Sequence, residues 1–198
     1  MLPQRINLIA YSTLAVIICY IDRVNISVAI IPMQEQFGWS DSQVGFIFSS
    51  FYLGYMLTMA LGGYLSDKFG GKRVLGWGVV LWSIFTILTP LAAHNGFFAL
   101  FFIRILMGIG EGVTFPAWHS LYARWIPFNE RTRAIAFTNS GVSIGTIIGY
   151  IGTQMIILAM GWEWAFYIFG IVGLVWFIFW NRNVTSYPNE HKRISAEA

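Results

Sequence analysis

The sequence predicts an all-α membrane protein with six transmembrane helices. Hydrophobic residues make up 57% of the 198-residue chain, charged residues make up only 11%, and the apolar residues gather into six long runs. A soluble domain carries about 25% charged residues. With so little charge, most of the surface of this chain is unsuited to water.

Each apolar run is long enough to cross a hydrocarbon core about 30 Å thick, which takes about 20 helical residues. The first run is too long for a cleaved signal peptide. Ser40 and Gln43 have the spacing of a capping box at the start of the second helix. The bundle is expected to span residues 1–181, followed by a linker or tail over residues 182–198. Its helices are expected at 7–31, 43–65, 74–93, 97–120, 134–158 and 164–181.

The basic residues outside these runs all fall on one side of the predicted topology. The loops of the other side, around Asp41, His94 and Glu163, contain no Lys or Arg. By the positive-inside rule, both termini and the tail are therefore expected to be cytoplasmic. The sequence pI of about 9.1 thus indicates topology and not nucleic-acid binding. The basic residues outside the apolar runs are Arg5, Lys68, Lys72, Arg73, Arg124, Arg131, Arg133, Arg182, Lys192 and Arg193.

Four ionisable side chains interrupt the predicted helices: Asp22 and Arg23 in the first, and Arg104 and Glu111 in the fourth. A charge at the bilayer centre costs at least about 2.5–3.5 kcal/mol, so none should face lipid. Residue counting places Asp22, Arg23 and Arg104 at one depth, with Glu111 about 10 Å closer to the cytoplasm. This arrangement indicates an anion site with a proton path. The alternative is that the charges only pair to hold the two helices together.

Other kinds of site are not predicted. No HExxH or GxSxG motif occurs, which argues against an intramembrane enzyme. The single cysteine, Cys19, excludes an internal disulfide, and no Cys/His spacing suggests zinc. We interpret Cys19 as a small apolar filler within a membrane helix. Gly141, Gly145 and Gly149 are four residues apart, which predicts close helix packing.

The segment between the second and third helices contains glycines at 63 and 70, an acid at 67 and basic residues at 68, 72 and 73. This pattern resembles a motif of the major facilitator superfamily, in which it latches the cytoplasmic side of the closed transporter. Gly71 stands at a position that is frequently basic in that family. The alternative is a plain cytoplasmic turn whose charges only set topology. The matching residues, called the latch motif below, are Gly63, Asp67, Lys68, Gly70, Lys72 and Arg73.

Three further stretches, at 20–25, 104–116 and 125–133, resemble the anion:cation symporter branch of that superfamily. This branch includes sugar-acid permeases and carriers of sialic acid, phosphate and vesicular glutamate. The tail, from Pro188 to Glu197, resembles the start of its central loop. Family members have twelve helices in two six-helix halves, and each half consists of two three-helix inverted repeats. The chain resembles the N-terminal half.

The resemblance implies a role for each intramembrane charge. Arg23 and Arg104 match arginines that bind the substrate, Tyr20 and Tyr55 match positions that line the cavity, and Asp22 and Glu111 match acids of proton coupling. A guanidinium binds carboxylate or phosphate through two parallel hydrogen bonds. We expect Asp22 to stay ionised beside Arg23, and Glu111 to be the more easily protonated.

The expected function is secondary active transport of a small organic anion, a carboxylate or sugar acid, coupled to protons and working by alternating access. The expected partners are the lipid bilayer, the anion, and a C-terminal six-helix half or a second copy. The expected location is the plasma (inner) membrane, and no cofactor is expected besides the coupling cation. The alternatives are an inorganic phosphate or sodium-coupled carrier, or a truncated half that does not transport alone.

Overall fold

The computed structural model describes residues 2–186, and these residues confirm the all-α membrane architecture. Six helices are long and apolar enough to cross a membrane. One of these spans is divided in two, so the described chain contains α1 (Leu2–Phe37), α2 (Asp41–Phe69), α3 (Gly71–His94), α4 (Phe97–Gly112), α5 (Thr114–Trp125), α6 (Phe128–Met160) and α7 (Trp162–Asn183). Most of the predicted tail, residues 187–198, lies outside the described residues.

Apart from the start of α4 at Phe97, the spanning helices begin and end outside the predicted apolar spans. Hydropathy marks only the part of a helix that matches the hydrocarbon, whereas the backbone hydrogen bonds continue into the polar interface. Polar residues therefore extend both ends of α1 and the start of α6. The start of α2 is set by the predicted capping box: the Ser40 backbone N–H donates to the Gln43 side chain at 2.9 Å, and the Gln43 N–H donates to the Ser40 hydroxyl at 3.3 Å.

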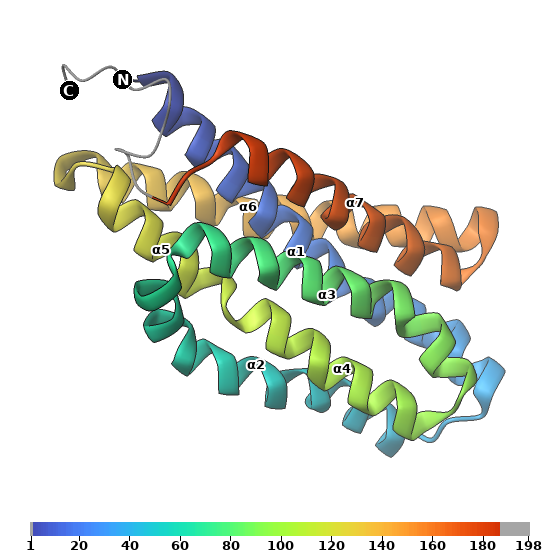
Figure 1. Cartoon of the computed structure of the whole chain (residues 1–198). Helices are drawn as coiled ribbons and strands as arrows, with labels where there is room; N and C mark the ends of the chain where they lie inside the picture. Colours follow the sequence, from blue (N-terminus) through green and yellow to red (C-terminus); the bar gives the residue numbers. More distant parts are fainter. Residues whose placement is uncertain (1, 187–198) are drawn as a thin grey trace.

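The fourth predicted helix, 97–120, is interrupted at Val113, where α4 ends and α5 begins (Figure 1). Pro116 has no N–H, so the carbonyl of Gly112 loses its usual helical donor. Helical bonding then resumes from the Ala117 N–H to the Val113 carbonyl, at 3.0 Å. The break separates the stretch that carries Arg104 and Glu111 from the stretch that reaches the end of the bundle.

The start of α1, the α2–α3 turn, the α5–α6 turn and the end of α7 all lie at the left of Figure 1. We call this the basic end, because it carries Lys68, Lys72, Arg73, Arg124 and Arg131. The α1–α2, α3–α4 and α6–α7 turns lie at the opposite end (Figure 1).

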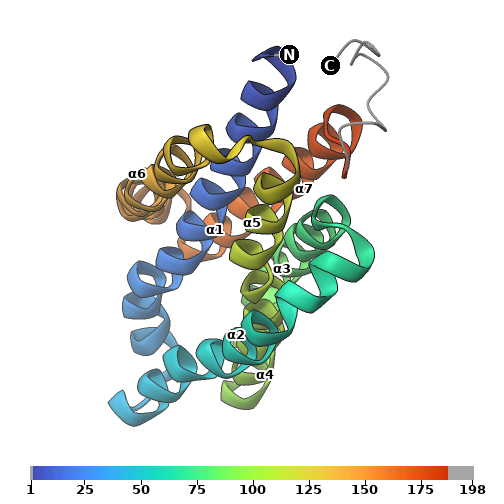
Figure 2. The ribbon, with the colours of Figure 1, turned by 90° about the vertical axis from the view of Figure 1, so that its left-hand side faces the viewer.

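The helix pairs repeat in a symmetric way. Helix α1 packs most closely along α6, and α4 packs most closely along α2, as Figure 2 shows. The first helix of each three-helix set therefore packs against the second helix of the other set, as expected for two inverted repeats.

Glycines allow close backbone contact in both of these pairs. A Cβ on Gly145 of α6 would lie 2.5 Å from the Ile17 carbonyl oxygen of α1, which confirms the predicted packing role of this glycine ladder. In the α2–α4 pair, a Cβ on Gly54 would collide with the Ile105 carbonyl, and one on Gly108 with the Phe51 carbonyl. These contacts bring the charged residues of α1 and α4 into one interior.

Candidate functional site

Arg23 of α1 is paired with Glu111 of α4. The Nε and Nη2 groups of Arg23 donate to the same oxygen, Glu111 Oε2, at 3.2 and 3.0 Å. The Glu111 side chain is fully buried, whereas 16% of the Arg23 side chain is exposed. Residue counting had placed Glu111 well below the level of Arg23. It compared positions along the helix axes and omitted the reach of a long arginine side chain.

Asp22 does not pair with Arg23, contrary to expectation. Neighbouring residues on an α-helix point about 100° apart, since a turn takes 3.6 residues, so the two side chains leave α1 in different directions. Asp22 is fully buried. Neither of its carboxyl oxygens has a hydrogen-bond partner among the described residues. Its charged neighbours include Glu111 and Arg104, and the Trp82 side chain also lies beside it.

Arg104 is enclosed, with 2% of its surface exposed. Its Nη1 donates to the Met107 sulfur at 3.2 Å, and its Nε has no hydrogen-bond partner within the described chain. The two arginines thus differ: Arg23 is ion-paired and partly exposed, while Arg104 is enclosed and only weakly hydrogen-bonded.

Aromatic rings surround both guanidinium groups. The Arg23 guanidinium lies 4.8 Å from the Tyr20 ring centre and 4.7 Å from that of Tyr55, the two predicted lining residues. The Phe51 ring lies against both arginines, 5.2 Å from Arg23 and 4.9 Å from Arg104. Sequence reasoning missed Phe51, although it precedes Tyr55 by four residues and so shares its helix face.

Cys19 is also part of the site. Its thiol donates to Glu111 Oε2 at 3.3 Å, and Arg23 Nη2 lies 3.8 Å from its sulfur. Cys19 is buried in the hydrophobic core, as expected of a small filler, but its contact with Glu111 was not predicted. Cys19 precedes Arg23 by one helical turn, which places both side chains on the face of α1 that meets Glu111.

The latch motif is mostly helical, and its only turn is at Gly70, where φ is +85°. Asp67 accepts hydrogen bonds from Arg124 at 3.2 Å and from Ser120 at 3.3 Å, which ties α2 to α5. Lys72 donates to the Asn181 carbonyl of α7 at 3.0 Å.

The other residues of the segment lie either at the surface or, in the case of Gly71, at a helix contact. Gly63, Lys68 and Arg73 are exposed. A Cβ on Gly71 would lie 2.5 Å from the Ala117 carbonyl, so a larger residue there would push α3 away from α5. The departure from the basic residue therefore allows close packing at the basic end.

The described residues contain no group of three or more His, Cys, Asp or Glu side chains that could hold a metal ion. The only acid that contacts an arginine within the membrane is Glu111, in the part of the chain that the structure describes. The arrangement offers two cationic forks in an apolar interior, which suits an anion.

Comparison with known proteins relates the chain to membrane transporters. Residues 12–198 match the sequence profile of the Major Facilitator Superfamily. The chain is 46% identical over 193 residues to the "Probable anion transporter 4, chloroplastic" of Oryza sativa subsp. japonica, covering 98% of the chain and 33% of that protein. It is 44% identical to the "Ascorbate transporter, chloroplastic" of Arabidopsis thaliana, with 98% and 36% covered. It is 43% identical to the "Sodium-dependent phosphate transport protein 1, chloroplastic" of the same plant, with 98% and 38% covered.

Solved structures share the fold. A bacterial homologue of the lysosomal transporter Spinster, inward-facing and unoccupied, aligns with a TM-score of 0.80 at 24% identity, covering 99% of this chain and 46% of that one. A D-xylose–proton symporter aligns with a TM-score of 0.82 at 20% identity, covering 94% of this chain and 50% of that one.

The chain spans about a third of the length of the curated relatives named above. Their names place those relatives in the chloroplast, which does not support the expected plasma (inner) membrane.

Proposed function

Because the chain belongs to the major facilitator superfamily, we propose that it forms half of a proton-coupled transporter for a small organic anion. The chain is a multi-pass membrane protein and not an enzyme. The observation that carries the proposal is the Arg23–Glu111 pair, because a carboxylate already occupies the guanidinium that an anionic solute would need.

Substrate binding in this proposal is an exchange of carboxylates on Arg23. The guanidinium is planar and stays charged in a poorly solvated site, so it can hold the carboxylate of a solute with two parallel bonds. Tyr20 and Tyr55 border it on faces that an arriving organic anion would contact. Arg104 is the second cation of the proposed site. It would reach the solute only after α1 and α4 rearrange, because it is enclosed here.

In this proposal, the coupling of anion entry to proton entry follows from charge balance in the site. Asp22, Arg23, Arg104 and Glu111 sum to zero net charge. When the solute displaces Glu111 from Arg23, it leaves a carboxylate buried without a partner, which is costly unless that group takes up a proton. One monovalent anion and one proton then enter together and keep the net charge at zero. Asp22, enclosed and unpaired, is proposed as a second proton position.

The second half of the transporter is proposed to cover the outer faces of α2 and α6. Only 22% of the most apolar part of α2 and 17% of that of α6 are buried inside this bundle. The two helices are therefore the ones that the described chain leaves most open. Alternating access would then rock the second half against this one about the site.

Binding tests the proposed anion site directly. The purified chain in lipid nanodiscs should bind ascorbate more tightly than an uncharged sugar of similar size, detected as a rise in melting temperature. Arg23→Lys should weaken this binding, whereas the matched control Arg182→Lys, at an exposed position of α7, should not. Equal binding of ascorbate and the neutral sugar would overturn the proposal.

Inorganic phosphate is the second candidate substrate, because one relative is named a sodium-dependent phosphate transport protein. Joining the chain to the C-terminal half of the rice relative gives a twelve-helix protein for proteoliposomes. We expect a pH difference to drive uptake of ascorbate. Phosphate uptake driven by a sodium gradient, and not by a pH gradient, would replace the first candidate by the second.

The proposed orientation places the basic end in the cytoplasm. Single-cysteine labelling in a Cys19→Ser background measures it in intact cells. An impermeant thiol reagent should reach a cysteine at residue 94 from outside, and a cysteine at residue 131 only after permeabilisation. The reverse pattern would contradict the orientation.

A further inference from the structure

An apolar groove opens between α2 and α3, away from the charged interior. The cavity has a volume of about 440 Å³, and its walls come from α2 and α3. Ile109, Gly110 and Val113, at the α4–α5 junction, form its floor. A Cβ on Gly110 would lie 2.8 Å from the backbone nitrogen of Trp82, so α3 and α4 touch through their backbones and leave the floor shallow.

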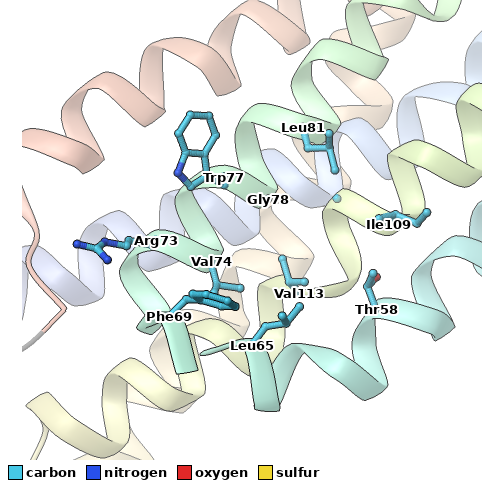
Figure 3. A pocket seen from close by; sticks show the side chains of 11 residues that line it. Thr58, Leu65, Phe69, Arg73, Val74, Trp77, Gly78, Leu81, Ile109 and Val113 are labelled. Carbon is cyan, nitrogen blue, oxygen red and sulfur yellow. The ribbon is translucent and has the colours of Figure 1, made fainter. Parts of the chain in front are cut away.

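The groove runs from the basic end into the membrane. Figure 3 shows Arg73 at one end of the lining and Leu81 and Ile109 toward the other. Leu81 lies eight residues beyond Arg73 on α3, which corresponds to about 12 Å along the helix. Apart from Arg73 and the Thr58 hydroxyl, the side chains in this lining are hydrocarbon or aromatic.

A polar pocket continues the groove at the basic end. This second cavity, of about 390 Å³, shares Phe69, Arg73 and Trp77 with the groove. Its other lining residues include Lys72 of α3 and the polar stretch that follows α7. Within the described chain, no hydrogen bond or ion pair engages the Arg73 guanidinium, and its side chain is exposed.

We propose that this continuous apolar groove and basic pocket form a binding site for one anionic phospholipid. One acyl chain lies along the groove, and the headgroup phosphate lies against Arg73, while the Lys72 ammonium stays on the Asn181 carbonyl at the side of the pocket. The order of the chemistry along the site, from cationic through aromatic to aliphatic, matches the order in a lipid from phosphate to chain. A soluble anion would leave the apolar groove exposed, and a helix of a second protein would leave the cationic pocket without a counter-charge.

Trp77 provides a specific probe, because it lines both cavities and 64% of it is exposed. The chain is reconstituted in phosphatidylcholine vesicles that contain a small fraction of bromine-labelled phosphatidylglycerol or bromine-labelled phosphatidylcholine. Subtracting the signal of Trp77→Phe isolates the quenching of this one tryptophan. We expect the labelled phosphatidylglycerol to quench Trp77 at about fivefold lower mole fraction, the preference of one basic side chain for anionic lipid.

Matched variants separate charge from shape. Arg73→Gln should abolish the preference, Arg73→Lys should retain most of it, and Arg182→Gln, which removes the same charge at a position outside both cavities, should leave it unchanged. Ile109→Phe should fill the groove floor and reduce quenching by both lipids. Equal quenching by the two labelled lipids would overturn the proposal, as would a preference that survives Arg73→Gln. Absence of any Trp77 quenching would show that protein covers the groove, and would also overturn it.

Discussion

Two neighbouring regions within the membrane each contain an acid and an arginine, but they differ in whether the two side chains form an ion pair. In the first, Arg23 and Glu111 form a direct ion pair beside a partly exposed surface. In the second, Asp22 and Arg104 are almost completely enclosed, and Asp22 has no hydrogen-bond partner among the described residues. Asp22 and Arg23 are therefore adjacent on α1 but lie in different environments. Under the proposed function, an anion would enter the paired region by displacing Glu111, whereas it would reach the enclosed region only after α1 and α4 rearrange.

The largest expected effect is on coupled transport. In the twelve-helix chimera with the rice C-terminal half, Glu111→Gln should abolish uphill accumulation driven by a pH difference, because the glutamine side chain does not bind and release a proton as a carboxylate does. Exchange of anion across the membrane should persist, since it needs no net proton movement. Continued pH-driven accumulation by Glu111→Gln would assign coupling to Asp22 or to the second half.

The two arginines should differ in binding. Arg23→Lys should lower the affinity of the chain for ascorbate by about tenfold, because an ammonium cannot reproduce the planar fork. Arg104→Lys should have a smaller effect, because its side chain is enclosed in this conformation. Binding measured by titration in nanodiscs checks both. A larger loss for Arg104→Lys would mean that the enclosed region binds the anion first.

Of these substitutions, replacement of Cys19 should have the smallest effect on ascorbate affinity. Cys19→Ala removes the thiol hydrogen bond to the Glu111 carboxylate, worth about 1 kcal/mol because a thiol is a weak donor. The incoming anion should then displace Glu111 from Arg23 more readily, which raises ascorbate affinity by up to about fivefold. An unchanged affinity, measured alongside Cys19→Ser as the hydroxyl control, would show that the thiol does not restrain Glu111.

Much of the fold could be predicted from the sequence, because hydrocarbon thickness sets helix length and lipid excludes charge. The helix interruption at Val113 could also have been predicted, since Pro116 removes a backbone donor within the predicted span. The curated relatives and solved transporters support the family resemblance, which rested on short stretches such as residues 20–25 and 104–116.

The pairing of the charges could not be predicted from depth alone. Residue counting gives the level of each Cα but not the direction of its side chain, and Asp22 and Arg23 differ mainly in direction. Arg23 reaches Glu111 because the arginine side chain is long enough to span the difference in depth between the two residues. The role of Cys19 was missed for the same reason, because its contact depends on which face of α1 meets α4.

Glu111, and not Asp22, is the partner of Arg23 in this structure. Thermal unfolding of the purified chain in nanodiscs compares Glu111→Gln with Asp22→Asn, two substitutions that each remove one buried acid without changing side-chain size. Glu111→Gln should destabilise the chain by about 2–3 kcal/mol, below the 3–5 typical of a fully buried pair because Arg23 is partly exposed. Asp22→Asn should leave the melting temperature unchanged or raise it, since it breaks no ion pair. The opposite ranking, with Asp22→Asn the more destabilising variant, would show that Asp22 and not Glu111 is the partner of Arg23.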